Sequence, residues 1–268
     1  MGLIYPQRIL TTYASLRASD KVTNKNGGTM QISFEGKIVL IAGGTGGLGR
    51  SVALAFLNER ANVAVTYRSE EEFAALKSAA GESASLLTGH TVDVTDETAT
   101  NTLVKQLTAT HGRIDALVNT VGGYAGGTTL WDLETKTFDR MLALNLRSGY
   151  SLARAVLPTM LAQKHGSIVN VAAKAAIDHG AGASAYAASK AAAVALMDSL
   201  AADTKGTGVR VNSILPSIID TPINRQAMPT APFDRWPKPE DIARVILFLS
   251  SDQARVIHGA SIPVYGDS

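Results

Sequence analysis

A tyrosine and a lysine in the second half of the chain have the spacing of a proton-transfer pair. Tyr186 and Lys190 stand four residues apart at the start of an Ala-rich segment, so a helix there would place both side chains on one face. An ammonium near a phenol lowers the pKa of the phenol, which lets the phenol exchange a proton near neutral pH. The pair therefore predicts general acid chemistry. An ordinary surface contact is the alternative, so the elements around the pair decide its meaning.

A glycine-rich loop follows the first predicted strand. Gly44-x-Gly46-x-x-Gly49 lies between the β-branched run 37–42 and the helical pattern 51–60. Glycines let the backbone turn sharply and approach a pyrophosphate, and the unpaired N–H groups at a helix start attract an anion. The sequence therefore predicts a dinucleotide site at this loop, with a merely flexible turn as the alternative.

The second predicted strand leads directly into a basic residue, Arg68. A site for NAD usually presents a carboxylate to the adenosine ribose at this point, whereas a guanidinium can hold a 2′-phosphate by charge-assisted hydrogen bonds. The sequence therefore predicts NADP in preference to NAD. The alternative is that Arg68 is a solvated residue ahead of an acidic helix, which a capping box at Ser69–Glu72 would open.

The elements that must position these residues alternate along the chain. From residue 36 onward, short β-branched runs alternate with helix-length amphipathic segments, which is typical of a parallel sheet wrapped by helices. Seven strands are predicted, at 37–42, 62–67, 85–92, 116–121, 166–171, 209–215 and 260–264. We expect a doubly wound, three-layer α/β fold of Rossmann type with a seven-stranded parallel sheet. The proline-rich stretch 216–237 predicts an irregular loop or small lid over the site.

The first 33 residues differ in composition from the rest of the chain. Four bases stand against one acid, Asp20, in residues 1–29, and the run 24–28 has the composition of a linker. We expect an N-terminal arm at 1–33 and a single domain at 34–268. A cytoplasmic location is expected, and organelle targeting by residues 1–29 is the alternative.

Composition excludes several classes of function. Lys and Arg total 25 and Asp and Glu total 23, so a net charge of +2 is too small and too mixed to predict nucleic-acid binding. The chain has no cysteine, which excludes thiolate catalysis and cysteine-ligated metals, and its five histidines lack metal-ligand spacing, so no metal is expected. No apolar run approaches the about 18 residues of a membrane span.

An ordered set of motifs runs through the predicted fold: Gly43-x-x-x-Gly47-x-Gly49, Asp93-Val94, Asn119-Thr120-Val121-Gly122, Asn145, Tyr186-x-x-x-Lys190, and Pro216 with Thr221. In these motifs the chain resembles the short-chain dehydrogenase/reductase family over about residues 34–265. The resemblance implies hydride transfer, with Tyr186 as the general acid, Lys190 on the nicotinamide ribose, and Asn145 holding a water of the proton relay. It implies that the cofactor residues are Gly43, Thr45, Gly46, Gly47, Leu48, Gly49, Arg68, Asp93, Val94, Asn119, Gly122, Tyr186, Lys190, Pro216, Ile219 and Thr221.

One position departs from that family. The family's catalytic serine lies thirteen residues before the tyrosine, where this chain has Ala173. A carbonyl substrate would lose a hydrogen bond to its developing oxyanion, a loss of about 10²–10³ in rate. The quinonoid dihydropteridine reductases share this departure, and the chain resembles them at 122–127, 173–178 and 220–229. That resemblance implies a flat acceptor beside Ala173, on which Tyr124 would stack; packing over the local glycines is the alternative for Tyr124.

The match to that branch is partial. The dihydropteridine enzymes prefer NADH and carry an acid where this chain has Arg68, whereas Asn145 follows the wider family. We expect an NADPH-dependent reductase of a small conjugated acceptor, with a carbonyl or 3-oxoacyl reductase as one alternative and an NADP-binding protein with a decayed active site as another. The resemblance also implies a homodimer or homotetramer, between which the sequence does not choose.

Overall fold

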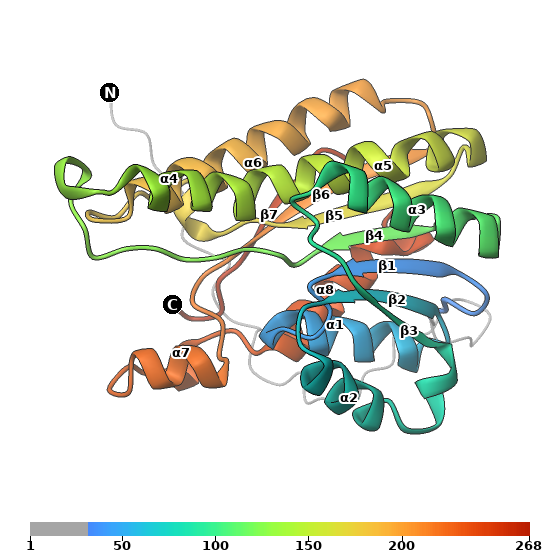
Figure 1. Cartoon of the computed structure of the whole chain (residues 1–268), viewed down its shortest axis with the longest axis horizontal. Coiled ribbons are helices and arrows are strands. Elements are labelled where there is room, and N and C mark those ends of the chain that lie inside the picture. Colours follow the sequence, from blue (N-terminus) through green and yellow to red (C-terminus); the bar gives the residue numbers. More distant parts are fainter. Residues whose placement is uncertain (1–31) are drawn as a thin grey trace, which may run out of the picture. The chain divides into compact units, whose positions relative to one another are not determined.

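A seven-stranded parallel sheet forms the centre of the described fold (Figure 1). The computed structural model describes residues 32–268. Its strands are β1 (Ile38–Ala42), β2 (Asn62–Tyr67), β3 (Leu87–Thr91), β4 (Ala116–Asn119), β5 (Gly166–Val171), β6 (Val209–Pro216) and β7 (Ser261–Val264). They lie in the order β3-β2-β1-β4-β5-β6-β7, so the chain changes direction between β1 and β4, where open α/β sheets bind ligands. The predicted Rossmann-type three-layer fold is confirmed.

Eight α-helices among the described residues form the outer layers. They are α1 (Gly47–Asn58), α2 (Glu70–Ala79), α3 (Glu97–His111), α4 (Thr135–Leu142), α5 (Ser148–Gln163), α6 (Ser184–Asp203), α7 (Pro222–Ala227) and α8 (Pro239–Ser250). α1 packs against α8, and α3 packs against α5 (Figure 1). Because helices cover both faces, the residues of β1, β4 and β5 are all buried.

The strand register aligns polar residues near the carboxyl ends of the central strands. Ala42 lies opposite Asn119, which lies opposite Asn170 on the next strand. β4 ends at Asn119, two residues earlier than predicted, because the Val121 N–H is bonded to the Asn119 side chain at 3.2 Å and not to a neighbouring strand. The chain therefore leaves the sheet where the site begins.

Other departures from the predicted elements are local. β3 begins at Leu87 because Gly81–Leu86 form a 3-10 turn, and the predicted irregular stretch 216–237 contains the short helix α7. Apart from Ile32 and Ser33, the predicted N-terminal arm at 1–33 lies outside the described residues. Within residues 32–268, no helix has the length and apolar character needed to cross a membrane.

Candidate active site

The loop between β1 and α1 leaves a helix start open to an anion. Gly43 has a φ of +76°, and the N–H groups of Gly43 and Gly44 donate to the hydroxyl and carbonyl oxygens of Thr66, at 3.0 and 3.1 Å. A Cβ on Gly49 would lie 2.0 Å from the Gly43 carbonyl oxygen, so only glycine lets the helix pack this close to the loop. α1 begins at Gly47 without a side-chain cap, so its first N–H groups can bind a phosphate.

A cleft of about 730 Å³ begins at this loop. The predicted cofactor residues that line it are Gly43, Thr45, Gly46, Arg68, Asp93, Val94 and Gly122. The lining also contains residues that were not among the predicted cofactor residues: Thr66, Tyr67, Glu72, Thr91, Val92, Thr95, Thr120, Val121, Arg140, Ala143 and Leu144. A cleft of this size beside an uncapped helix start and a glycine turn fits a dinucleotide.

The remaining predicted cofactor residues lie around the cleft and do not line it. Leu48, Gly49, Asn119 and Pro216 are buried. A Cβ on Gly47 would lie 2.8 Å from Thr221 Cγ2, so the first residue of α1 and the start of α7 approach each other closely. The Ile219 carbonyl accepts a hydrogen bond of 2.8 Å from the Asn224 side chain.

Charged side chains gather at one part of the cleft, which we call the charged end and define by Arg68, Glu72 and Asp93. Asp93 accepts hydrogen bonds from the Thr95 hydroxyl at 2.7 Å and the Thr95 N–H at 2.9 Å. These bonds, and more weakly the charge of Arg68, lower the pKa of Asp93. Arg68 is exposed and makes no hydrogen bond or ion pair with residues 32–268 in this structure. Its guanidinium is therefore available to bind an anion.

A π turn places Asn145 inside the protein. Residues Ala143–Arg147 join α4 to α5, and the Ser148 N–H donates to the Ala143 carbonyl, five residues back. Asn145 Oδ1 accepts from the Gly123 N–H at 2.9 Å, and Nδ2 donates to the Gly123 carbonyl at 3.0 Å and to Ser189 Oγ at 2.9 Å. The buried amide thus ties the loop after β4 to α6.

Lys190 lies in the same cluster. Its Nζ donates to the Val171 carbonyl at 3.0 Å, and only 5% of the residue is exposed. A Cβ on Gly122 would lie 2.9 Å from Asn145 Oδ1 and 3.1 Å from Lys190 Nζ, so the glycine allows both side chains to reach the cleft. Burial lowers the pKa of Lys190 to about 8. We call Tyr186, Lys190 and Asn145 the tyrosine site.

Tyr186 holds its proton more tightly than the sequence predicted. Burial, and secondarily the charge of Tyr124, raises the pKa of Tyr186 to about 12. The expected lowering of this pKa by Lys190 is wrong for this structure, because desolvation of the phenolate dominates and the Lys190 ammonium is bonded to Val171. A phenol with a raised pKa stays protonated at neutral pH and can act as an acid.

Tyr124 and Ala173 differ in exposure. Tyr124 is 68% exposed, and its ring meets the Tyr186 ring edge to face, with centroids 5.0 Å apart. Ala173 is buried two residues after the end of β5 and offers no hydroxyl. Ser184 Oγ is buried without a hydrogen-bond partner among the described residues, so no observed bond directs it to the missing role. The Tyr124 ring also packs over Gly126, where an added Cβ would lie 2.1 Å from the Tyr124 hydroxyl oxygen, so the alternative of packing over the local glycines is confirmed. An exposed aromatic ring therefore lies beside Tyr186, and residue 173 lacks the hydroxyl of the family pattern.

Ionic contacts fix the start of the segment 216–237. Asp220 accepts from Arg225 Nη2 at 2.8 Å and also pairs with Lys238. The hydrogen bonds from both cations hold the pKa of Asp220 well below its usual range. Thr221 caps α7 by accepting from the Asn224 N–H at 3.3 Å. The predicted lid segment therefore has a fixed base next to the predicted cofactor residue Thr221.

Some residues that shape the site carry only a faint sequence signal. Ser189 accepts from Asn145 and donates to the Tyr186 carbonyl at 2.8 Å, and its place directly before Lys190 was the one available clue. Thr120 donates from its hydroxyl to the Ala42 carbonyl at 2.7 Å, which closes the loop under the cleft. Arg140 lines the cleft from α4, whose orientation the sequence pattern did not determine.

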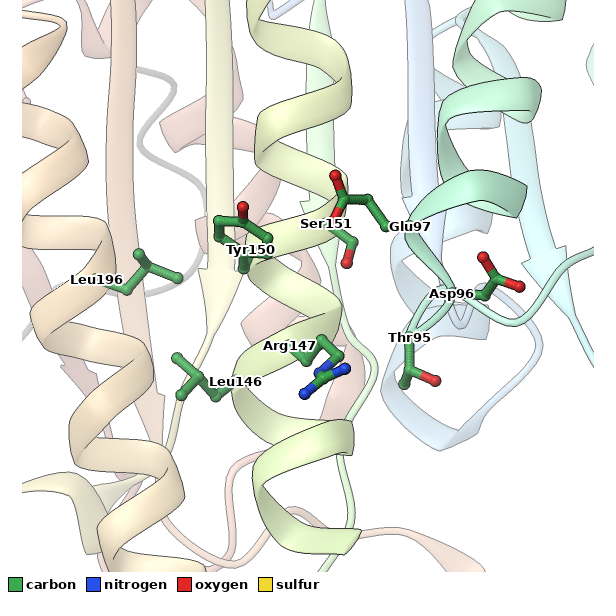
Figure 2. A pocket seen from close by; sticks show the side chains of 8 residues that line it. All are labelled: Thr95, Asp96, Glu97, Leu146, Arg147, Tyr150, Ser151 and Leu196. Atoms are coloured by element: carbon green, nitrogen blue, oxygen red, sulfur yellow. The ribbon is translucent and has the colours of Figure 1, made fainter. Parts of the chain in front are cut away.

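A second cavity, of about 580 Å³, contains none of the predicted site residues (Figure 2). Its side chains come from the start of α3, from α5 with the turn before it, and from α6. They are Thr95, Asp96, Glu97, Leu146, Arg147, Tyr150, Ser151 and Leu196. The predicted chemistry therefore belongs to the first cleft and the tyrosine site.

Comparison with known proteins agrees with this geometry. The short chain dehydrogenase family matches residues 37–231. A 3-oxoacyl-[acyl-carrier-protein] reductase of Thermotoga maritima is 32% identical over 241 residues, covering 87% of this chain and 98% of the relative. A D-threitol dehydrogenase of Mycolicibacterium smegmatis is 32% identical over 242 residues, with 87% and 93% covered.

Solved structures show the same fold. ElxO with NADP bound superposes with a TM-score of 0.81 at 26% identity, over 86% of this chain and 97% of that one. A short-chain type dehydrogenase/reductase from Mycobacterium ulcerans gives a TM-score of 0.83 at 26% identity, over 88% and 90%. The family match covers more than half of the chain and includes the glycine loop and the tyrosine site. This chain belongs to the short chain dehydrogenase family and is an oxidoreductase of that family.

Proposed function

We propose that this chain is an NADPH-dependent reductase that delivers hydride to a small conjugated acceptor, with a quinonoid dihydropterin as the candidate substrate. The observation that carries the proposal is the pairing of a buried Ala173 with an exposed Tyr124 ring against Tyr186. The site lacks a hydroxyl suited to a lone carbonyl and offers an aromatic face suited to a flat ring. A conjugated ring that is already electron-poor has less need of that hydroxyl.

The cofactor assignment rests on the cleft. The glycine loop and the uncapped start of α1 would hold the pyrophosphate, and Arg68 would hold the 2′-phosphate of NADP. Asp93 would contact adenine and Thr221 the carboxamide. The solved structure of ElxO with NADP bound supports a nicotinamide dinucleotide in this family. Preference for NADP over NAD is part of the proposal.

Proton transfer follows from the tyrosine site. A bound NADPH supplies the hydride that adds to the acceptor. Tyr186, with a pKa of about 12, keeps its proton at neutral pH and donates it to the acceptor atom that gains the negative charge. The Lys190 ammonium would bind the nicotinamide ribose and favour the phenolate that remains. Asn145 would hold the water through which Tyr186 regains a proton, while its amide fixes Gly123 and Ser189.

A carbonyl or 3-oxoacyl reductase is the second candidate. The Thermotoga maritima relative, named 3-oxoacyl-[acyl-carrier-protein] reductase, supports it at 32% identity over almost its whole length. Ala173 opposes it, because a ketone oxyanion would lack a donor at that position.

A panel of acceptors tests the proposal. NADPH oxidation would be followed with quinonoid dihydropterin, simple quinones and acetoacetyl thioesters, each with and without the protein. We expect turnover with the conjugated acceptors at a higher kcat/KM than with the thioesters. The reverse order would favour the second candidate. Tight NADPH binding with no turnover of any acceptor would indicate a decayed active site.

The proposal also includes a cytoplasmic homodimer or homotetramer. α5 and α6 contribute to the second cavity, where Tyr150 is 42% exposed, and their outward face is the surface that a second copy would cover (Figure 2). Light scattering of the purified chain should give the mass of two or four chains. The mass of one chain would contradict this part of the proposal.

A further inference from the structure

Glu72 is a carboxylate at the charged end that the predicted capping box does not explain. Ser69 caps α2 as expected, accepting from the Glu72 N–H at 3.3 Å. The Glu72 carboxylate, however, accepts a hydrogen bond from the Thr45 hydroxyl at 2.9 Å, and both residues line the cleft. It thereby joins the first turn of α2 to the glycine loop.

The charged side chains that line the cleft differ in the hydrogen bonds and ion pairs that they make. They belong to Arg68, Glu72, Asp93 and Arg140. Asp93 is held by two hydrogen bonds from Thr95, whereas Glu72 is bonded to one neutral hydroxyl and neither arginine pairs with a described acid in this structure. Glu72 is exposed, so packing by neighbouring residues does not hold its side chain in place. Glu72 and Asp93 are therefore the negative groups that an anion entering the charged end would meet, and Glu72 has the fewer hydrogen bonds of the two.

A hydroxyl has one proton to donate, so Thr45 can bond to Glu72 or to a phosphate oxygen but not to both. A 2′-phosphate entering beside Arg68 would also experience repulsion from the Glu72 carboxylate. A ribose 2′-hydroxyl carries no charge and can donate a hydrogen bond to a carboxylate. Arg68 and Glu72 thus act in opposite directions on the same feature of the cofactor.

We propose that Glu72 is a specificity-determining residue that opposes the 2′-phosphate and so limits the preference for NADP that Arg68 provides. The inference rests on the proposed function, because it requires a nicotinamide dinucleotide in this cleft. In this proposal, the preference for NADP over NAD results from attraction of the 2′-phosphate by Arg68 and its repulsion by Glu72. Both side chains are exposed, so both effects on affinity become weaker as ionic strength rises.

The test compares Glu72→Gln with Glu71→Gln. Glu71 lies next to Glu72 in the first turn of α2 but does not line the cleft, so its change removes the same charge outside the site. Dissociation constants would be measured by fluorescence titration for NADPH and NADH, and by competition for adenosine 2′,5′-bisphosphate and AMP. We expect Glu72→Gln to tighten NADPH and the bisphosphate roughly three- to tenfold at low salt, with little change for NADH and AMP.

A second variant separates charge from hydrogen bonding. Glutamine can still accept from Thr45, whereas Glu72→Ala frees that hydroxyl, so the alanine variant should bind NADPH at least as tightly as the glutamine variant. Equal NADPH affinities for Glu72→Gln and Glu71→Gln would overturn the inference. Failure of the wild-type chain to bind either nucleotide would overturn the proposed function instead.

Discussion

The tyrosine site and the charged end of the cleft hold their side chains in different ways. At the tyrosine site the polar groups are largely buried, and Lys190 and Asn145 are bonded to backbone atoms of Val171 and Gly123. At the charged end Arg68 and Glu72 are exposed, and Glu72 has one neutral partner. Buried hydrogen bonds are expensive to break, whereas exposed charges are screened and easily exchanged. We therefore expect the geometry of the tyrosine site to resist substitution, and the side chains at the charged end to rearrange at low cost.

The largest expected effect is at the tyrosine site. Tyr186→Phe removes the proton donor and should lower kcat by about 10²–10⁴-fold, with the NADPH dissociation constant almost unchanged. Steady-state kinetics and fluorescence titration would measure the two quantities. Tyr150→Phe, which removes a hydroxyl outside the cleft, is the matched control. Equal losses in kcat and NADPH affinity would show that Tyr186 serves binding and not proton transfer.

At the charged end, Arg68→Asp should act on binding instead. The change removes a charge-assisted contact to the 2′-phosphate and adds repulsion, so the NADPH dissociation constant should rise roughly 10- to 100-fold while that of NADH changes little. Arg255→Asp makes the same charge change at an exposed position outside the cleft lining. An unaltered NADPH to NADH ratio would remove Arg68 from cofactor selection.

The two ends should also respond differently to pH. The pKa of Lys190 is lowered to about 8, so its ammonium is lost as pH rises through that value, while Tyr186 stays protonated because its pKa is about 12. We expect kcat to fall roughly tenfold per pH unit above this region. NADPH affinity at the charged end should change much less over the same interval.

A stability measurement checks that Lys190 is the group responsible. The unfolded lysine keeps its proton up to its ordinary pKa of 10.5, so between pH 8 and 10.5 the unfolded state binds more protons than the folded state. The wild-type free energy of unfolding should therefore receive an increasing contribution from Lys190 as pH rises in this window, and Lys190→Met should lack this increase.

The kinetic prediction has its own contrary outcome. A kcat that is flat from pH 7 to 10 would exclude a requirement for the Lys190 ammonium.

The smallest expected effect concerns the acceptor. Ala173→Ser supplies the missing hydroxyl and should raise the kcat/KM for simple ketones by about tenfold, with little effect on conjugated acceptors. Ala176→Ser, at a similarly buried alanine three residues later, is the control. No gain with any ketone would mean that another feature restricts the substrate.

The fold was predictable to the extent that local pattern decides it. The strands β2 and β5 have the predicted bounds because each is a short, almost wholly buried run that contains β-branched residues. The glycine loop and the Tyr186–Lys190 spacing likewise depend on residues close together in sequence. These local features are enough to carry the resemblance to the family.

Contacts between distant segments could not be read in this way. A capping box predicts that Glu72 turns back to Ser69, yet its carboxylate bonds to Thr45, 27 residues earlier. The raised pKa of Tyr186 depends on burial by the whole fold, which its spacing from Lys190 does not encode. The contact of Glu72 and the proton affinity of Tyr186 therefore depend on the tertiary arrangement and not on local sequence.

The π turn at Ala143–Arg147 has a consequence for insertions and deletions. It contains one residue more than an α-helical turn would need, and each residue of an α-helix rotates the helix by about 100°. Loss of any one residue there would convert the π turn into an α-helical turn and rotate α4 relative to α5 by about that angle. If α5 kept its present orientation, the Asn145 side chain could then no longer reach Gly123 and Ser189. The position of the Asn145 side chain therefore depends on the number of residues in this turn as well as on their identity.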